Sequence, residues 1–139
     1  MVSFEKVIRK FQKLDEYLDI LKEISQTPQK VFLNDKILLG GAKYYLQVSI
    51  ESCLDVANHI IASEKFRAPQ DYSDSFTVIQ EQGLIASELG DKLRQMTKFR
   101  NRLVHLYGEI DDAYVYEYIK EDLRDLEEFK SIIINLYKT

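Results

Sequence analysis

The chain has 139 residues, of which 45% are hydrophobic and 30% are charged, and its formal net charge is −4. This length suits one domain, expected over residues 1–139, and can bury a core without disulfides or metals. Five glycines and two prolines are too few for the frequent turns of a β-sandwich or barrel, and the negative charge argues against a general nucleic-acid binder, though not against a local basic site.

The single cysteine and the N-terminal segment both bear on the cellular compartment in which the protein is expected. Cys53, the single cysteine, lies in an apolar helical pattern, which indicates a buried side chain rather than a nucleophile. The charged N-terminal segment does not resemble a signal peptide, and no apolar run approaches the roughly 20 residues of a membrane span. We therefore expect a cytoplasmic protein without membrane contact.

The first predicted helix covers residues 3–25. Its apolar residues recur at steps of three and four, as on one face of an amphipathic helix. Ser3 is the expected N-cap, and residues 26–28, ending in Pro28, are expected to terminate the helix. The apolar stripe consists of Phe4, Val7, Ile8, Phe11, Leu14, Tyr17, Leu18 and Leu21.

The second predicted helix is longer, from residue 34 or 35 to residue 65, and it has apolar residues on more than one face. Such a helix is expected at the centre of a bundle, where it contacts several partners. Gly40 and Gly41 mark a weak point, for which a close helix crossing is one interpretation. A polar loop over residues 66–74 and a short helix over residues 75–82, closed by Gly83, follow.

Two more helices complete the prediction. One begins near Ser87 and ends at Gly108, and the other is capped by Asp111 or Asp112 and continues to Leu136. The whole chain is therefore expected to be all-α, an up-and-down bundle of about four or five helices.

Charge is unevenly distributed along the last two helices. From Asp91 to Gly108 the chain has one acid and five cations, whereas the segment after Gly108 is strongly acidic. One interpretation is that the two charged faces are solvated and pair with each other. The other is a strip that faces phosphate. The cations, called the basic ridge below, are Lys92, Arg94, Lys98, Arg100 and Arg102.

His105, in the same segment, favours the second interpretation. Asn101 lies four positions before His105 and shares its helix face, while Arg100 lies about 140° away around an ideal helix and can reach the edge of that face. A lone histidine among apolar neighbours is more often structural. His59 receives that interpretation, because it has no cations nearby.

Metal ligation is not expected. The chain has only two histidines and one cysteine, without paired ligand spacing. Asp55 and His59, four positions apart, are interpreted as a contact within a helix rather than as a coordination pair. No cofactor-binding fingerprint is present either.

Residues 99–107, FRNRLVHLY, resemble the R-x-x-x-x-H motif of HEPN domains in the extended form R-N-x-x-x-H-x-Y of HepT-like toxins. Residues 50–61 resemble the central helix of that family, residues 84–93 the run before the motif, and residues 129–136 the closing helix. The resemblance therefore covers nearly the whole chain.

This resemblance implies a metal-independent endoribonuclease toxin that acts as a homodimer on RNA. It places Arg100 and His105 of both protomers in a cleft at the dimer interface. It also implies a partner, a minimal nucleotidyltransferase antitoxin of the MNT type, which adds AMP to Tyr107. No cofactor and no metal are implied.

The residue types suit this chemistry. A histidine can serve as base and acid near neutral pH, so His105 is the expected proton-transfer group. Arg100 would hold the phosphate and stabilise developing charge. Asn101 and Arg102 would support them, Asn101 by orienting His105 or binding phosphate. Tyr107, next to the helix end, would carry an AMP that blocks RNA.

Two other functions remain open on the sequence. The first is a non-catalytic HEPN dimer that binds a nucleotidyltransferase partner or a nucleotide, which the acidic last helix favours. The second is a helical interaction protein with an incidental motif, in which His105 would be buried and hydrogen-bonded inside one protomer.

Overall fold

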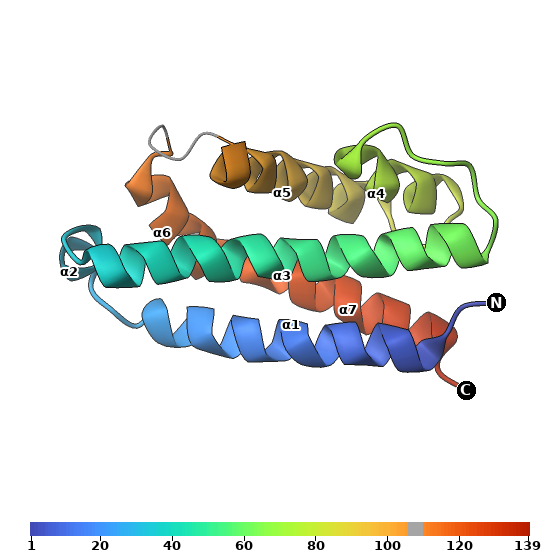
Figure 1. Ribbon diagram of the computed structural model, residues 1–139, viewed down its shortest axis with the longest axis horizontal. Helices are drawn as coiled ribbons and strands as arrows, with labels where there is room; N and C mark the ends of the chain where they lie inside the picture. Colours follow the sequence, from blue (N-terminus) through green and yellow to red (C-terminus); the bar gives the residue numbers. More distant parts are fainter. Residues whose placement is uncertain (106–109) are drawn as a thin grey trace.

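The computed structural model describes residues 1–105 and 110–139, and within these ranges the chain forms seven helices and no strand. The predicted all-α fold is confirmed. The helices are α1 (Phe4–Ile24), α2 (Gln29–Leu33), α3 (Lys36–Ser63), α4 (Tyr72–Glu81), α5 (Ser87–His105), α6 (Asp112–Glu121) and α7 (Leu123–Tyr137). In Figure 1, α1 and α4–α5 lie on opposite sides of α3, and both ends of the chain lie at one end of the bundle.

Helix α1 forms as its apolar periodicity predicts. The Ser3 side chain accepts a hydrogen bond from the backbone N–H of Lys6 at 3.3 Å, which confirms Ser3 as the N-cap. The residues at steps of three and four then turn towards α3. The buried ones are Val7, Phe11, Leu14, Leu18, Leu21 and Ile24.

Helix α3 is the central element, since it contacts each of the other six described helices. Asp35 caps it by accepting hydrogen bonds from the backbone N–H groups of Ile37 and Leu38. The helix continues through Gly40 and Gly41, and a Cβ added at either glycine would meet nothing within 4 Å. The interpretation of these glycines as a close helix crossing is therefore wrong within this chain.

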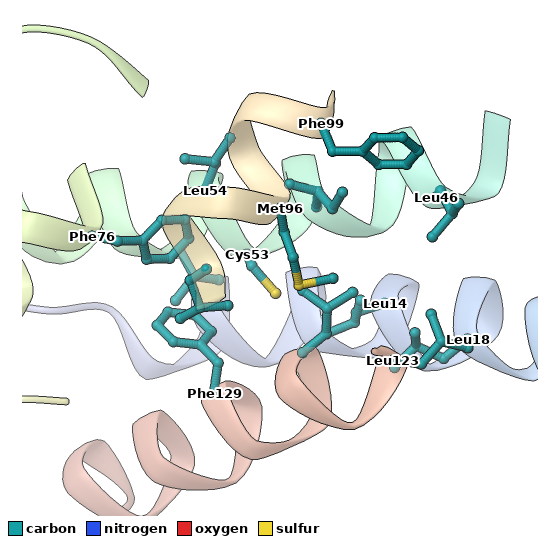
Figure 2. Close-up of a cluster of buried hydrophobic side chains, with 14 of the residues drawn as sticks. Leu14, Leu18, Leu46, Cys53, Leu54, Phe76, Met96, Phe99, Leu123 and Phe129 are labelled. Carbon is teal, nitrogen blue, oxygen red and sulfur yellow. The ribbon is translucent and has the colours of Figure 1, made fainter. Parts of the chain in front are cut away.

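The buried side chains of the described residues form one hydrophobic cluster. Phe129 of α7 packs edge-to-face against Phe11 and Phe76, with ring centroids 6.2 Å and 5.6 Å away. Cys53 points into the same cluster, near Met96 (Figure 2), and its burial raises the pKa of its thiol. Cys53 is thus a core residue, as predicted. The expected boundary of one domain at residues 1–139 stays a prediction.

The structure departs from the predicted elements at three places. Residues 29–33 form the short helix α2, which buries Phe32. Helix α4 begins at Tyr72 rather than at residue 75, because Asp71 accepts a hydrogen bond from the backbone N–H of Asp74 and caps it there. The predicted last helix is divided at Asp122 into α6 and α7. Asp111 caps α6 through the backbone N–H of Ala113, one of the two predicted caps.

Along residues 1–105 and 110–139, no helix combines the length and the hydrophobicity that crossing a membrane requires.

Candidate active site

Helix α5 carries the motif, and its burial pattern decides which motif residues reach the surface. Phe99 and Leu103 are buried, and the Phe99 ring stacks on Tyr118 of α6 with a centroid distance of 4.3 Å. Because these two positions face the core, the residues between and after them turn outwards. Asn101 is thereby half-buried, and His105 is exposed.

Arg100 is held by side chains from three helices. Its Nη2 donates to Glu51 Oε2 of α3 at 2.5 Å, and its Nη1 donates to Asn101 Oδ1 at 3.0 Å. Its Cζ lies 5.2 Å from the ring centroid of Tyr72, at the start of α4. The side chain is only 13% exposed. This arrangement fixes the guanidinium in one orientation. The Arg100 side chain therefore loses less conformational entropy when it binds an anion.

The Nε of Arg100 is buried and has no hydrogen-bond partner among the described residues. The guanidinium borders a small cleft of about 260 Å³, lined also by Glu51, Leu54, Asp55, Asn58 and Tyr72. A buried donor of a charged group without a partner is costly to the fold. The cleft thus holds one guanidinium with two carboxylates, Glu51, which pairs with Arg100, and Asp55, which pairs with Lys10.

His105 lies at the last described position of α5, one helical turn beyond Asn101. Its side chain forms no hydrogen bond or ion pair with residues 1–105 or 110–139, and it does not line the Arg100 cleft. The alternative of a helical interaction protein with an incidental motif required His105 to be buried inside one protomer, and His105 is exposed instead. Of the predicted site residues, Arg100 and Asn101 are brought together, whereas His105 lies outside their cleft in a single chain. Tyr107 lies outside the described residues.

The basic ridge is divided between paired and exposed cations. Lys92 Nζ lies 3.7 Å from Asp125 Oδ1 of α7, Arg94 hydrogen-bonds Thr77 and Gln80 of α4, and Arg100 pairs with Glu51. The predicted pairing with the acidic segment after Gly108 therefore holds for Lys92, whereas Arg94 and Arg100 have their partners elsewhere. Lys98 and Arg102 are exposed and form no ion pair with the described part of the chain. They leave positive charge on the surface near the motif.

His59 is hydrogen-bonded within the chain, as predicted, but the premise that it has no cations nearby is wrong, because Lys6, Arg9, Lys10 and Lys13 line one cavity with it. Its Nε2 accepts a hydrogen bond from the backbone N–H of Ser3 at 3.0 Å, which ties the start of α1 to α3. Burial, Lys6 and the N-terminal amine together lower its pKa. Asp55 pairs with Lys10 of α1 at 2.9 Å. The described residues contain no group of three or more potential metal ligands.

The sequence analysis missed the residues that surround Arg100 from other helices. Glu51, Asn58 and Tyr72 line the cleft, but none belongs to the motif. A signal existed for two of them: Glu51 and Asn58 are polar and seven positions apart in a largely apolar helix, so they share a face. Their partner on the neighbouring helix could not be deduced from that spacing.

Comparison with known proteins points to one family. The family model described as "Ribonuclease HepT-like" matches residues 14–133. The chain is 36% identical over 109 residues, 78% of each chain, to the mRNA nuclease HepT of Shewanella oneidensis. It is 25% identical over 118 residues, 84% of this chain and 80% of the other, to the tRNA nuclease HepT of Aphanizomenon flos-aquae.

Solved structures agree with these relatives. A toxin–antitoxin crystal structure with AMP-PNP matches with a TM-score of 0.89 and 28% identity, covering 94% of this chain and 98% of that chain. The tri-AMPylated HEPN toxin of Shewanella oneidensis, solved in complex with its MNT antitoxin, matches with a TM-score of 0.88 and 29% identity, covering 94% and 97%.

Proposed function

The chain belongs to the ribonuclease HepT-like family, and on that basis we propose that it is a metal-independent endoribonuclease toxin. The observation that carries the proposal is Arg100, an arginine held in one orientation at the border of a small cleft by Glu51, Asn101 and Tyr72. A phosphate of RNA is an anion that a guanidinium binds through charge-assisted hydrogen bonds. Two further motif residues, Asn101 and His105, lie within the next two helical turns.

The proposed reaction is an internal transfer at phosphorus. A base removes the proton of the 2′-OH, whose oxygen attacks the adjacent phosphorus, and an acid protonates the 5′-oxygen that leaves. The products are a 2′,3′-cyclic phosphate end and a 5′-OH end. His105 supplies the proton transfers, Arg100 stabilises the charge on the phosphoryl oxygens, and Asn101 and Arg102 assist in holding the phosphate.

A homodimer would complete the site. One chain offers only one exposed histidine at the motif, and this histidine does not line the Arg100 cleft of its own chain. In a dimer with two-fold symmetry, the same surface of both copies meets, so two His105 side chains and two Arg100 side chains share one cleft. One histidine can then serve as base while the other serves as acid.

The partner is proposed from the relatives. One similar solved structure is a tri-AMPylated HEPN toxin with its MNT antitoxin. For this chain we therefore propose a minimal nucleotidyltransferase antitoxin of the same type, acting in the cytoplasm, with Tyr107 as the acceptor of AMP. The added phosphate groups would repel RNA at the mouth of the cleft.

Cleavage of single-stranded RNA in the presence of a chelator tests the enzymatic proposal. His105→Ala is expected to lower kcat by about 100-fold or more, because general acid–base catalysis contributes that much. His59→Gln serves as the matched histidine control and should cleave at the wild-type rate. If His105→Ala cleaves RNA as fast as the wild type, or if the chelator abolishes cleavage, the proposal is wrong.

A second function is favoured by the acidity of α6 and α7. This surface would repel RNA and could instead bind a basic partner. A non-catalytic dimer that binds a nucleotidyltransferase or a nucleotide would leave RNA uncut under all conditions of the same assay. The exposed or half-buried acids concerned are Asp112, Glu117, Glu121, Asp122, Glu127 and Glu128.

A further inference from the structure

A second cavity, of about 630 Å³, lies beside the Arg100 cleft and shares Asn58 and Tyr72 with it. Its walls come from the end of α3, the loop that follows and the start of α4, and Asn101 of α5 lies at its border. We propose that this cavity binds one base of single-stranded RNA next to the scissile phosphate. The inference rests on the proposed ribonuclease function and specifies the substrate at the same site.

Two side-chain amides of the cavity are set up as donors. The Oδ1 of Asn58 accepts a hydrogen bond from Ser75 Oγ at 2.6 Å, and the Oδ1 of Asn101 accepts one from Arg100 Nη1 at 3.0 Å. Each amide therefore has its oxygen engaged and its NH₂ group left to donate. Uracil and guanine present a carbonyl acceptor where cytosine and adenine present an amino donor. The cavity should accordingly prefer uracil or guanine.

The remaining walls suit the flat faces of a base. Phe66 and Tyr72 both line the cavity, and the Tyr72 side chain is 54% exposed. Recognition of single-stranded RNA depends largely on stacking of unpaired bases on aromatic rings and arginine planes. Because Tyr72 also lies against the Arg100 guanidinium, a base that stacks on it has its own phosphate close to Arg100. Because Tyr72 borders both the cavity and the Arg100 cleft, a nucleotide of RNA suits the two together better than an unrelated small ligand does.

Lys65 provides an independent observation. It follows the end of α3 with φ of +58°, the left-handed region in which glycine is strongly preferred. Its side chain is exposed, lines the cavity and forms no ion pair with the described part of the chain. The left-handed backbone belongs to the end of α3, where the N–H of Phe66 donates to the carbonyl of Ile61, and it places the Lys65 side chain at the cavity wall. The phosphate on the far side of the bound base is the group that Lys65 would contact.

One acid, Asp71, stands in the cavity wall. Its Oδ1 accepts hydrogen bonds from the backbone N–H of Asp74 and from Ser73 Oγ, because it is the N-cap of α4. Its negative charge works against a bound phosphate, so Lys65, in the same wall, is the group that offsets it. The cavity combines two amide donors, two aromatic rings and one lysine without an ion pair in the described part of the chain with an otherwise largely apolar wall, a composition that suits the flat face and the polar edge of a base.

The test measures binding rather than cleavage. Four short homopolymers with 2′-fluoro sugars lack the 2′-OH nucleophile, so their Kd values for the full chain are independent of catalysis. The wild type should bind the uracil and guanine oligomers about tenfold more tightly than the cytosine and adenine oligomers. Asn58→Asp exchanges the donor for an acceptor and should abolish or reverse this preference. Asn135→Asp on α7, which does not line the cavity, should leave it unchanged.

Lys65→Gly adds a variant that is expected to fold at least as well as the wild type, because glycine suits the left-handed backbone. It should weaken binding of all four oligomers equally. The slope of log Kd against the logarithm of the salt concentration should decrease by the amount expected for about one phosphate contact. Equal Kd values for all four bases in the wild type, or an unchanged preference in Asn58→Asp, would overturn the inference. A clear preference in a protein that never cleaves RNA would leave this base site standing and reject the ribonuclease function.

Discussion

At the scale of single residues, Arg100 shows how one side chain is prepared for an anion. Its contacts come from Glu51 on α3, Tyr72 on α4 and Asn101 on α5. An arginine that is 13% exposed needs a counter-charge, because a buried unpaired cation is strongly unfavourable. Glu51 supplies that charge in the absence of phosphate, so its carboxylate also competes with the ligand.

Replacing Glu51 with glutamine tests its role as the counter-charge of Arg100. Glu51→Gln keeps the shape and an acceptor oxygen but removes the negative charge beside Arg100. We expect the free energy of unfolding to fall by about 1–2 kcal/mol, since a hydrogen bond to a charged group is weakened in a partly buried place. Urea unfolding measures this change. Glu23→Gln, at an exposed position of α1, should change stability by less than about 0.5 kcal/mol; equal effects of the two substitutions would contradict the assignment.

His59 predicts a pH dependence of stability. Burial lowers its pKa, as do Lys6 and the N-terminal amine, and its Nε2 accepts the Ser3 N–H only when the ring is neutral. The unfolded chain therefore takes up a proton first as the pH falls, so this contribution is complete above about pH 6.5 and is lost as the pH decreases towards the lowered pKa. His59→Gln should flatten the dependence measured by urea unfolding between about pH 7.5 and pH 5.5. Identical slopes for variant and wild type would argue against it.

At the scale of helices, the long elements could be predicted and the short ones could not. α1 and α3 have enough turns for their apolar periodicity to stand out, and their ends agree with the caps at Ser3 and Asp35. α2 has only five residues, too few for a periodic pattern. The two helices that meet at Asp122 pack differently: α6 contacts α2, which α7 does not, although both contact α1 and α3 and both reach α5, α6 through the Tyr118 ring on Phe99.

The residues of the candidate site likewise fall into those that could be predicted from the sequence and those that could not. Arg100, Asn101 and His105 could be predicted because they share one helix, where spacing gives the face. Glu51, Asn58 and Tyr72 come from two other helices. Periodicity shows which face of its own helix each of these residues occupies. It does not show which faces of different helices pack together, because that depends on how the helices cross. A motif search therefore finds the residues of one element and misses the others.

Two glycines in this chain predict opposite effects of one substitution. Gly40 lies in the middle of α3, is exposed, and has open space where a Cβ would be added. Gly40→Ala should raise the free energy of unfolding by about 0.5–1 kcal/mol through helix propensity. Gly83 follows α4 and has a φ of +80°, in the left-handed region that an alanine rarely adopts. Gly83→Ala should therefore lower the free energy of unfolding by about 1 kcal/mol. Thermal unfolding of both variants checks the signs, and the same sign for both would refute this account.

At the scale of the whole molecule, the proposed homodimer would join two separated parts of the motif. The Arg100 cleft opens between α3, α4 and α5, yet the histidine of the motif lies outside it. Lys98 and Arg102 add exposed positive charge on the same helix. In the proposed homodimer, two such helices facing each other across a two-fold axis would concentrate positive charge locally on a chain whose formal net charge is −4.

Mixing wild-type and His105→Ala chains tests whether the two histidines act together. If one cleft needs a histidine from each protomer, only dimers of two wild-type chains cleave RNA, and activity follows the square of the wild-type fraction. At a wild-type fraction of about one tenth, random assembly after dilution from urea should leave about 1% of the activity rather than about 10%. An excess of His59→Gln, whose motif is intact, should cause no loss. A linear dependence on the wild-type fraction would mean that each protomer cleaves independently, and the shared cleft would have to be abandoned.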